Sequence, residues 1–146
     1  MRINSANPTE LPAARKTITF TGAAGLGAVG AVPLFTTTGQ VFIERLVPFC
    51  TTLLTEAGAT ATLALGVTGS TSLFIAATTA VDIDANEFWV DTAPDAAGVA
   101  LPAALIAIAI NANIIGTVAA QNVNSGVIDF TVYWRPLSSG ATLVAA

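Results

Sequence analysis

The side chains best suited to binding or catalysis form a run of oxygen donors in the middle of the chain. Asp82, Asp84 and Asn86 stand at alternate positions, so they would share one face of a strand. In a loop they could converge on a hard cation such as Ca²⁺, which prefers oxygen ligands. An EF-hand loop beginning at Asp82 needs glycine at its sixth position and glutamate at its twelfth, where this chain has Glu87 and Ala93. The three residues are therefore candidates for a metal site outside the EF-hand class.

The same acidic run has two other interpretations. It could be a solvated loop, or it could pair with basic residues of another subunit, namely Arg45, Arg135 or those of the N-terminal segment. Asp91 and Asp95 extend the run, so there are enough carboxylates for a glycosidase pair. Nothing in their spacing selects two of them, and we predict no enzymatic activity.

A glycine-rich segment resembles a nucleotide-binding motif. Gly25–Gly30 reads GLGAVG, which matches the GxGxxG pattern, and Glu44 follows at a distance suited to holding a ribose. The motif needs a helix that begins within it, but Pro33 and the run Thr36–Gly39 would interrupt such a helix. We interpret the segment as a loop or strand packed tightly against a neighbour, and we predict no cofactor.

The composition excludes several kinds of site. The chain has 146 residues, no histidine and one cysteine, so it can form no Ser-His-Asp triad, no internal disulfide and no four-thiolate zinc site. Cys50 is expected to be an unpaired core residue. Nine acidic residues against five basic ones give a net charge of -4. A nucleic-acid partner is not expected, because nucleic-acid-binding proteins need clustered Lys and Arg.

Charge is scarce, at 10% of the residues, and is absent between Ala96 and Ile128. Such a stretch lies either in a membrane or in a core and subunit interfaces. A spanning helix needs about 20 apolar residues, whereas the strongest apolar run, 96–110, contains Pro102 and ends at Asn111. We therefore expect no membrane partner and a protein made in the cytoplasm.

Alternation of polar and apolar residues predicts an all-β chain. The expected strands are Lys16–Phe20, Gln40–Phe49, Thr60–Val67, Glu87–Asp91, Asn113–Ala120 and Val127–Trp134. Pro48 indicates an edge or a bulge, and the turn residues 121–126 predict that the last two strands form a hairpin. In the final strand, Ile128, Phe130, Val132 and Trp134 are expected to face the core. Alanine-rich Thr71–Thr79 and Ala100–Ile108 are the best helical candidates.

No linker or repeat divides the chain, so a single domain is expected. Short strands separated by Gly, Thr and Asn turns are typical of a β-sandwich, jelly-roll-like, or of a small barrel. We assign this domain to residues 16–146. Residues 1–15 contain Pro8 and Pro12, which disfavour helix and sheet, and are predicted to form an extended N-terminal arm.

Three segments together resemble a family of virion proteins. They are Thr17–Gly30 (TITFTGAAGLGAVG), Asp82–Asp91 (DIDANEFWVD) and Val132–Ser139 (VYWRPLSS). They are similar to small, Ala/Thr/Gly-rich structural proteins of tailed bacteriophages, and the chain's length is most like that of a head decoration (cement) protein. The similarity covers most of the chain after the arm, and the family has no position-specific functional motif to transfer.

The resemblance implies a β-rich homotrimer that clamps the major capsid protein at the capsid surface of the virion. Interface candidates follow from it. Arg2, Arg15 and Lys16 in the arm would contact the capsid. The uncharged stretch 99–115, with Leu101, Leu105 and Ile108, would line contacts between subunits.

Three alternatives remain open at this point. A tail, neck or fibre-associated virion protein would share the composition, and a small membrane protein would also carry few charges. The third is a carbohydrate-binding or hydrolytic β-sandwich, in which Trp89, Trp134, Phe130 and Tyr133 could stack on sugars. At strand spacing, however, such aromatic residues more often belong to the core.

Overall fold

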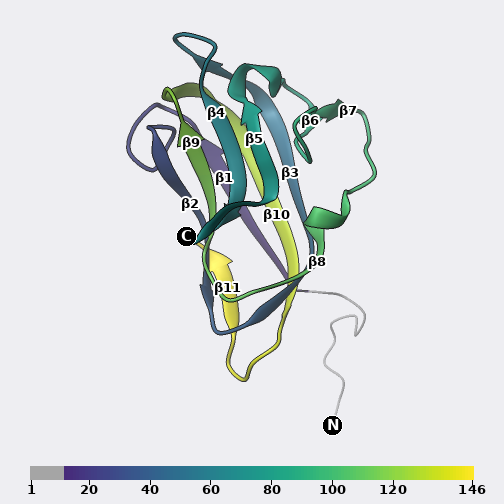
Figure 1. The fold of residues 1–146 in the computed structure, drawn as a ribbon. Helices are drawn as coiled ribbons and strands as arrows, with labels where there is room; N and C mark the ends of the chain where they lie inside the picture. The colour runs from purple at the N-terminus through teal and green to yellow at the C-terminus, as the bar shows by residue number, and fades with distance from the viewer. Residues whose placement is uncertain (1–11) are drawn as a thin grey trace.

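The computed structural model describes residues 12–146, and strands make up most of this part of the chain (Figure 1). The strands are β1 (Ala13–Thr19), β2 (Gly30–Thr38), β3 (Val41–Glu56), β4 (Thr62–Val67), β5 (Ser70–Thr79), β6 (Glu87–Phe88), β7 (Asp95–Ala96), β8 (Ile106–Ile110), β9 (Ile114–Ala119), β10 (Val123–Pro136) and β11 (Thr142–Ala145). Two single-turn 3-10 helices, η1 (Ala80–Asp82) and η2 (Ala103–Leu105), lie between strands.

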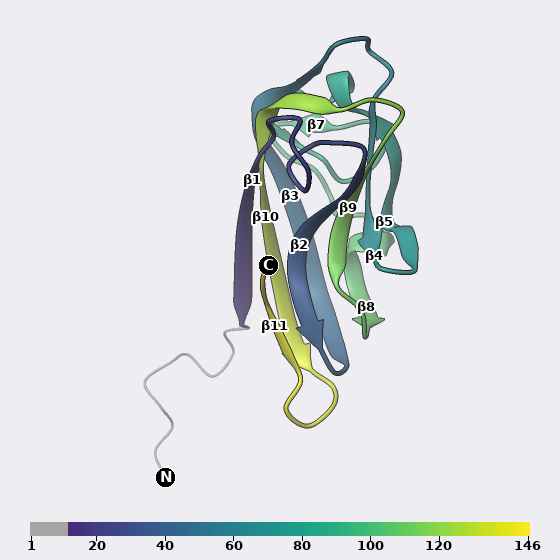
Figure 2. The ribbon, with the colours of Figure 1, turned by 90° about the vertical axis from the view of Figure 1, so that its left-hand side faces the viewer.

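The strands form two antiparallel sheets that pack against each other (Figure 2). The six-stranded sheet has the order β1-β10-β3-β6-β7, and β8 also pairs with β3. The five-stranded sheet has the order β11-β2-β9-β4-β5. The quartets β1-β10-β3-β8 and β2-β9-β4-β5 correspond to the two four-stranded layers of a jelly roll. The prediction of an all-β sandwich is confirmed, whereas a small barrel is wrong because the two sheets stay open over the described residues.

Alternation along β10 places its apolar residues in the core, as predicted. Ile128, Phe130 and Val132 are buried, while the residues between them are partly exposed on the outer face. Trp134, the fourth residue of the predicted row, is only half-buried and packs against the margin of the core. The central part of this strand therefore follows the period of two that a sheet imposes.

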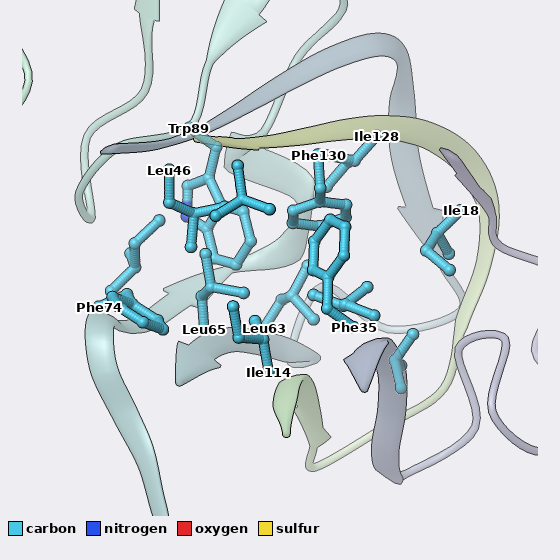
Figure 3. Packing of buried hydrophobic residues seen from close by; sticks show 14 of the residues in the cluster. Ile18, Phe35, Leu46, Leu63, Leu65, Phe74, Trp89, Ile114, Ile128 and Phe130 are labelled. Carbon is cyan, nitrogen blue, oxygen red and sulfur yellow. The ribbon is translucent and has the colours of Figure 1, made fainter. Parts of the chain in front are cut away.

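The core fills the space between the sheets (Figure 3). Trp89, Leu46 and Phe130 come from the six-stranded side and face Leu63 and Leu65 of β4. The rings of Trp89 and Phe130 meet edge to face with centroids 6.5 Å apart. The Trp89 indole Nε1 donates a hydrogen bond of 2.9 Å to the hydroxyl of Thr78, the one buried polar residue of the described chain. This bond satisfies the indole N–H inside an apolar environment.

The predicted hairpin of the last two long strands is wrong. β9 pairs with β2 and β4, whereas β10 pairs with β1 and β3 in the other sheet. The segment between them therefore carries the chain from one sheet to the other. Turn residues mark where a strand ends, but they do not determine which strand pairs with it.

Both helical candidates are also wrong. Thr71–Thr79 lies within β5, and Ala100–Ile108 contains the short η2 followed by the start of β8. The intrinsic preference of alanine for helix is small. Pairing of β5 with β4 and of β8 with β3 outweighs it, because each strand gains backbone hydrogen bonds and places apolar side chains in the core.

The boundary between the predicted arm and the sandwich differs from expectation. β1 begins at Ala13, so Ala13–Arg15 belong to the sandwich rather than to an arm, while residues 1–11 lie outside the described residues.

Pro48 lies inside the long central strand β3. Its carbonyl accepts the Trp89 backbone N–H at 3.1 Å, on the side where pairing with β8 ends at Arg45 and pairing with β6 begins at Phe49. The missing proline N–H therefore faces a gap in the ladder, as a proline in a strand requires.

Candidate interaction surfaces

Charged residues are distributed very unevenly between the two sheets. The strands β11, β2, β9, β4 and β5 of the five-stranded sheet contain no charged residue. The charges of residues 12–146 lie instead on β1, β3 and β10, and on the segment 80–96 that includes β6 and β7. One half of the sandwich therefore presents an uncharged surface, and the other half carries all the electrostatic features described below.

The uncharged edge is formed by β5, η2 and β8. β5 ends the five-stranded sheet and β8 flanks β3, so among the described residues each of them is paired along one side only. η2 packs against both strands and joins them into one surface. Leu73 and Ile106 are exposed there, at 36% and 40% of their surface. Exposed apolar edge strands without charges are templates for pairing with another chain.

The structure separates the predicted interface residues in the uncharged stretch. Leu105 has no exposed surface and belongs to the core, so its prediction as a contact residue is wrong. Leu101 and Ile108 are half-buried against the core, and both remain partly accessible. Ile106, which the sequence pattern does not single out, is exposed because the turn at η2 directs Leu105 inward and the next side chain outward.

The basic candidates are placed as follows. Arg15 is exposed on the outer face of β1, and Lys16 is half-buried with its Nζ donating to the carbonyl of Ala146. Both therefore belong to a strand of the sandwich rather than to an arm. Arg2 lies outside the described residues.

A second surface feature is a hollow of about 460 Å³ on the outer face of the six-stranded sheet. We call it the arginine hollow. Its lining residues are Arg15, Arg45, Val47, Phe49, Phe88, Asp129, Thr131 and Tyr133. Aromatic rings and guanidinium groups of this kind are enriched at the centres of protein interfaces.

The register of the strands explains the shape of the hollow. Thr131 pairs with both Arg15 and Val47, so two short side chains form its floor. Two residues from this pair, towards the start of β3, Tyr133 pairs with Arg45. Two residues in the opposite direction, Phe49 pairs with Asp129 on one side and with Phe88 on the other. Since the rows at residues 45 and 49 are four residues apart, roughly 13 Å separates them along the strand.

A β-bulge directs Arg45 into this hollow. The register of β3 and β10 shifts between Tyr133 and Trp134, and both Glu44 and Arg45 fall between the buried residues Ile43 and Leu46. The Arg45 guanidinium lies 4.4 Å from the centroid of the Tyr133 ring, a cation-π contact. At the opposite wall the rings of Phe49 and Phe88 are 4.8 Å apart. The walls of the hollow are thus held by contacts between side chains.

Ion pairing leaves most of the charges uncompensated. Within residues 12–146, Arg135 and Glu44 form the one ion pair. Asp129 accepts a hydrogen bond of 2.6 Å from the Thr17 hydroxyl, but neither arginine of the hollow has a carboxylate partner in the described chain. Two guanidinium groups in an acidic protein therefore remain available to an anionic group.

The acidic candidates do not converge on a metal site. Asp82 ends η1, buried Ile83 follows it, and Asp84 and Asn86 are exposed in the turn before β6. The Glu87 carboxylate accepts the Asp84 backbone N–H at 3.0 Å. No cluster of three or more His, Cys, Asp or Glu side chains suited to a metal occurs in the described part of the chain. The segment is anchored by buried Ile83, Trp89 and Val90, while Asp82, Asp84, Asp91 and Asp95 are exposed, and its strands β6 and β7 lie at the edge of the sheet (Figure 1).

Two other sequence candidates have structural roles. Gly25–Gly30 lies in the loop between β1 and β2, and it is followed by a strand rather than by the helix that phosphate binding needs. Trp89 and Phe130 are buried, so neither ring can stack on a sugar, whereas Tyr133 lines the arginine hollow.

Cys50 is a free, fully buried thiol, as predicted. Burial raises the pKa of the Cys50 thiol to about 11, because the thiolate loses its hydration in the core. The native protein is therefore expected to resist alkylation at pH 8 and to react with one equivalent of reagent when unfolded. Mass spectrometry after iodoacetamide treatment, with and without guanidinium chloride, measures this, and rapid labelling of the native protein would contradict it.

Two further observations complete the description. No helix of the described residues is long and apolar enough to cross a membrane. Comparisons with protein-family models, curated protein sequences and solved structures found no significant match.

Proposed function

We propose that this protein is a structural component of a tailed-bacteriophage virion, a decoration protein that self-associates and stabilises the assembled head. The observation that carries the proposal is the uncharged edge, where two neighbouring edge strands expose Leu73 and Ile106 with no charge to block pairing. Such an edge is expected to be covered in the working state, because exposed apolar edges cause uncontrolled association.

Two further features support this proposal. The jelly roll is an architecture used in viral capsids and in lectins, although a fold alone does not specify a function. The three segments that resemble phage virion proteins supply the context of the head. A protein that binds only the assembled shell stabilises that state by mass action, without needing a catalytic site.

The direct test is binding to heads. The purified protein is mixed with expanded heads that lack it, and bound protein is measured by co-sedimentation together with the resistance of the heads to heat. Saturable binding and a raised disruption temperature are expected. Binding to isolated tails but not to heads would instead support the alternative of a tail- or neck-associated protein, and binding to neither would overturn the proposal.

Self-association through the uncharged edge gives a sharper prediction. Replacing Ile106 by lysine places a charge on the exposed side of β8, and burying it unpaired in an interface is costly. We expect the dissociation constant of the oligomer to rise by about tenfold or more, since removing a central contact often costs over 1.4 kcal/mol. Sedimentation velocity over a range of concentrations measures this change.

Val144 provides the matched control. It is exposed at 54% on β11, at the opposite edge of the five-stranded sheet. The variant Val144→Lys makes the same chemical change and should leave the oligomer intact. Equal effects of the two variants, or none from Ile106→Lys, would exclude β8 from the interface.

A further inference from the structure

We infer that the acidic segment of one copy, residues 82–95, binds the arginine hollow of a second copy and thereby arranges the subunits head to tail. The inference rests on the self-association in the proposed function and specifies the contact that produces it. In this contact, the exposed carboxylates of Asp91 and Asp95 from the neighbouring subunit occupy the hollow.

Charge complementarity is the first argument. Arg15 and Arg45 line the hollow, and neither has an ion-pair partner within residues 12–146. The acidic segment carries Asp82, Asp84, Glu87, Asp91 and Asp95, and these carboxylates are likewise outside any ion pair of the described chain. The hollow also contains the Asp129 carboxylate, but its two guanidinium groups leave it with a net positive charge opposite to that of the acidic segment, which favours the correct orientation during association.

The position of the two surfaces is the second argument. The acidic segment projects from the edge of the six-stranded sheet, beyond β3, on the side where β8 also lies (Figure 1). The hollow lies on the outer face of the same sheet. Phe88 lines the hollow and pairs with Asp95, yet the carboxylate makes no ion pair with either arginine of its own chain. A contact with a different copy satisfies both groups.

A contact between an edge and a face of two copies is heterologous, because the two subunits use different patches. Repetition of such a contact about a rotation axis closes a ring, and a homotrimer is one such ring. The same arrangement brings the uncharged edge at β8 close to the next subunit, since β8 and β6 pair with the same side of β3. Apolar and charged contacts would then belong to one continuous interface.

The composition of the hollow also fits a protein segment. Val47, Phe49, Phe88 and Tyr133 provide apolar and aromatic walls, while the guanidinium groups provide the donors for carboxylates. An inorganic anion would use only the arginines and leave the aromatic walls uncovered. An acidic peptide segment covers both.

Charge reversal tests the inference on the full-length protein. Arg45→Glu replaces one guanidinium of the hollow by a carboxylate, and Asp91→Arg with Asp95→Arg reverses the opposing segment. Each reversal alone is expected to weaken the oligomer by about tenfold or more, because it brings like charges together in the interface. Combining all three substitutions in one chain should restore most of the affinity. Ala31→Glu with Val144→Glu changes the net charge by the same amount at two exposed positions of the five-stranded sheet, far from the hollow, and should leave the oligomer intact.

Sedimentation velocity at low salt gives the masses, and circular dichroism confirms that each variant is folded. A wild-type monomer at all concentrations would overturn this inference and the self-association in the proposed function, while head binding would still decide whether the protein is a decoration protein. A stable oligomer whose mass Arg45→Glu does not change, or a failure of the combined variant to recover, would overturn the inference and leave the proposed function standing. Recovery of the oligomer's affinity in the combined variant is the result that supports the inferred contact.

Discussion

Replacing Trp89 by alanine is expected to lower the free energy of unfolding by about 3–5 kcal/mol, as found for large aromatic residues removed from tightly packed cores. Trp89 has no exposed surface and lies against Phe130. Its indole N–H bonds to Thr78, and its backbone N–H bonds to the carbonyl of Pro48. The side chain therefore connects β5 of one sheet with β10 of the other, while the backbone holds the residue against β3, and removal of the indole leaves a cavity between the sheets.

Equilibrium unfolding in urea, followed by circular dichroism, measures this loss. Trp89→Phe keeps most of the apolar volume but removes the N–H that donates to the Thr78 hydroxyl, which keeps its own bond to the Ala76 carbonyl, so we expect a smaller loss of about 1–3 kcal/mol. Trp134→Ala is the matched control, because Trp134 is half-buried at the margin of the core. If Trp134→Ala destabilised the protein more than Trp89→Ala, the position of the core assigned here would be wrong.

Local patterns in the sequence predict which side chains face the core but not how the strands pair. Alternation along Ile128–Val132 and the burial of Cys50 agree with expectation, because both depend only on apolar character and a period of two. The partner of each strand depends on contacts between distant residues. β9 and β10 therefore resemble a hairpin in sequence, yet each lies in a different sheet.

The candidate interfaces show the same limitation at a finer scale. The uncharged stretch predicts an interface within 99–115, but the distinction between buried Leu105 and exposed Ile106 depends on a 3-10 turn that the sequence does not reveal. The arginine hollow depends on the bulge beside Arg45, which shifts the alternation of β3 by one residue. A bulge changes the direction of every later side chain, and no residue at this position predicts it.

The last prediction concerns the glycine-rich segment. We expect Gly27→Ala to lower the free energy of unfolding more than Gly30→Ala or Gly98→Ala does. Gly27 has φ of +115°, which residues other than glycine rarely adopt. A Cβ on it would also lie deep within the van der Waals radius of the Val123 carbonyl oxygen. Since the Val123 N–H bonds to the Gly27 carbonyl at 2.8 Å, the loop and the start of β10 cannot separate without losing that bond.

Replacing two other glycines by alanine distinguishes the effect of backbone strain on stability from that of steric overlap. Gly30 has φ of +128° but open space around a Cβ, so Gly30→Ala should cost roughly 1–2 kcal/mol through backbone strain alone. Gly98 has neither feature, and Gly98→Ala should change the stability by no more than about 1 kcal/mol. Gly27 combines both features, so Gly27→Ala should lower the free energy of unfolding by more than about 4 kcal/mol. Urea unfolding of the three variants gives the order, and a Gly27→Ala loss no larger than that of Gly30→Ala would show that this close approach is not what requires glycine in the GLGAVG segment.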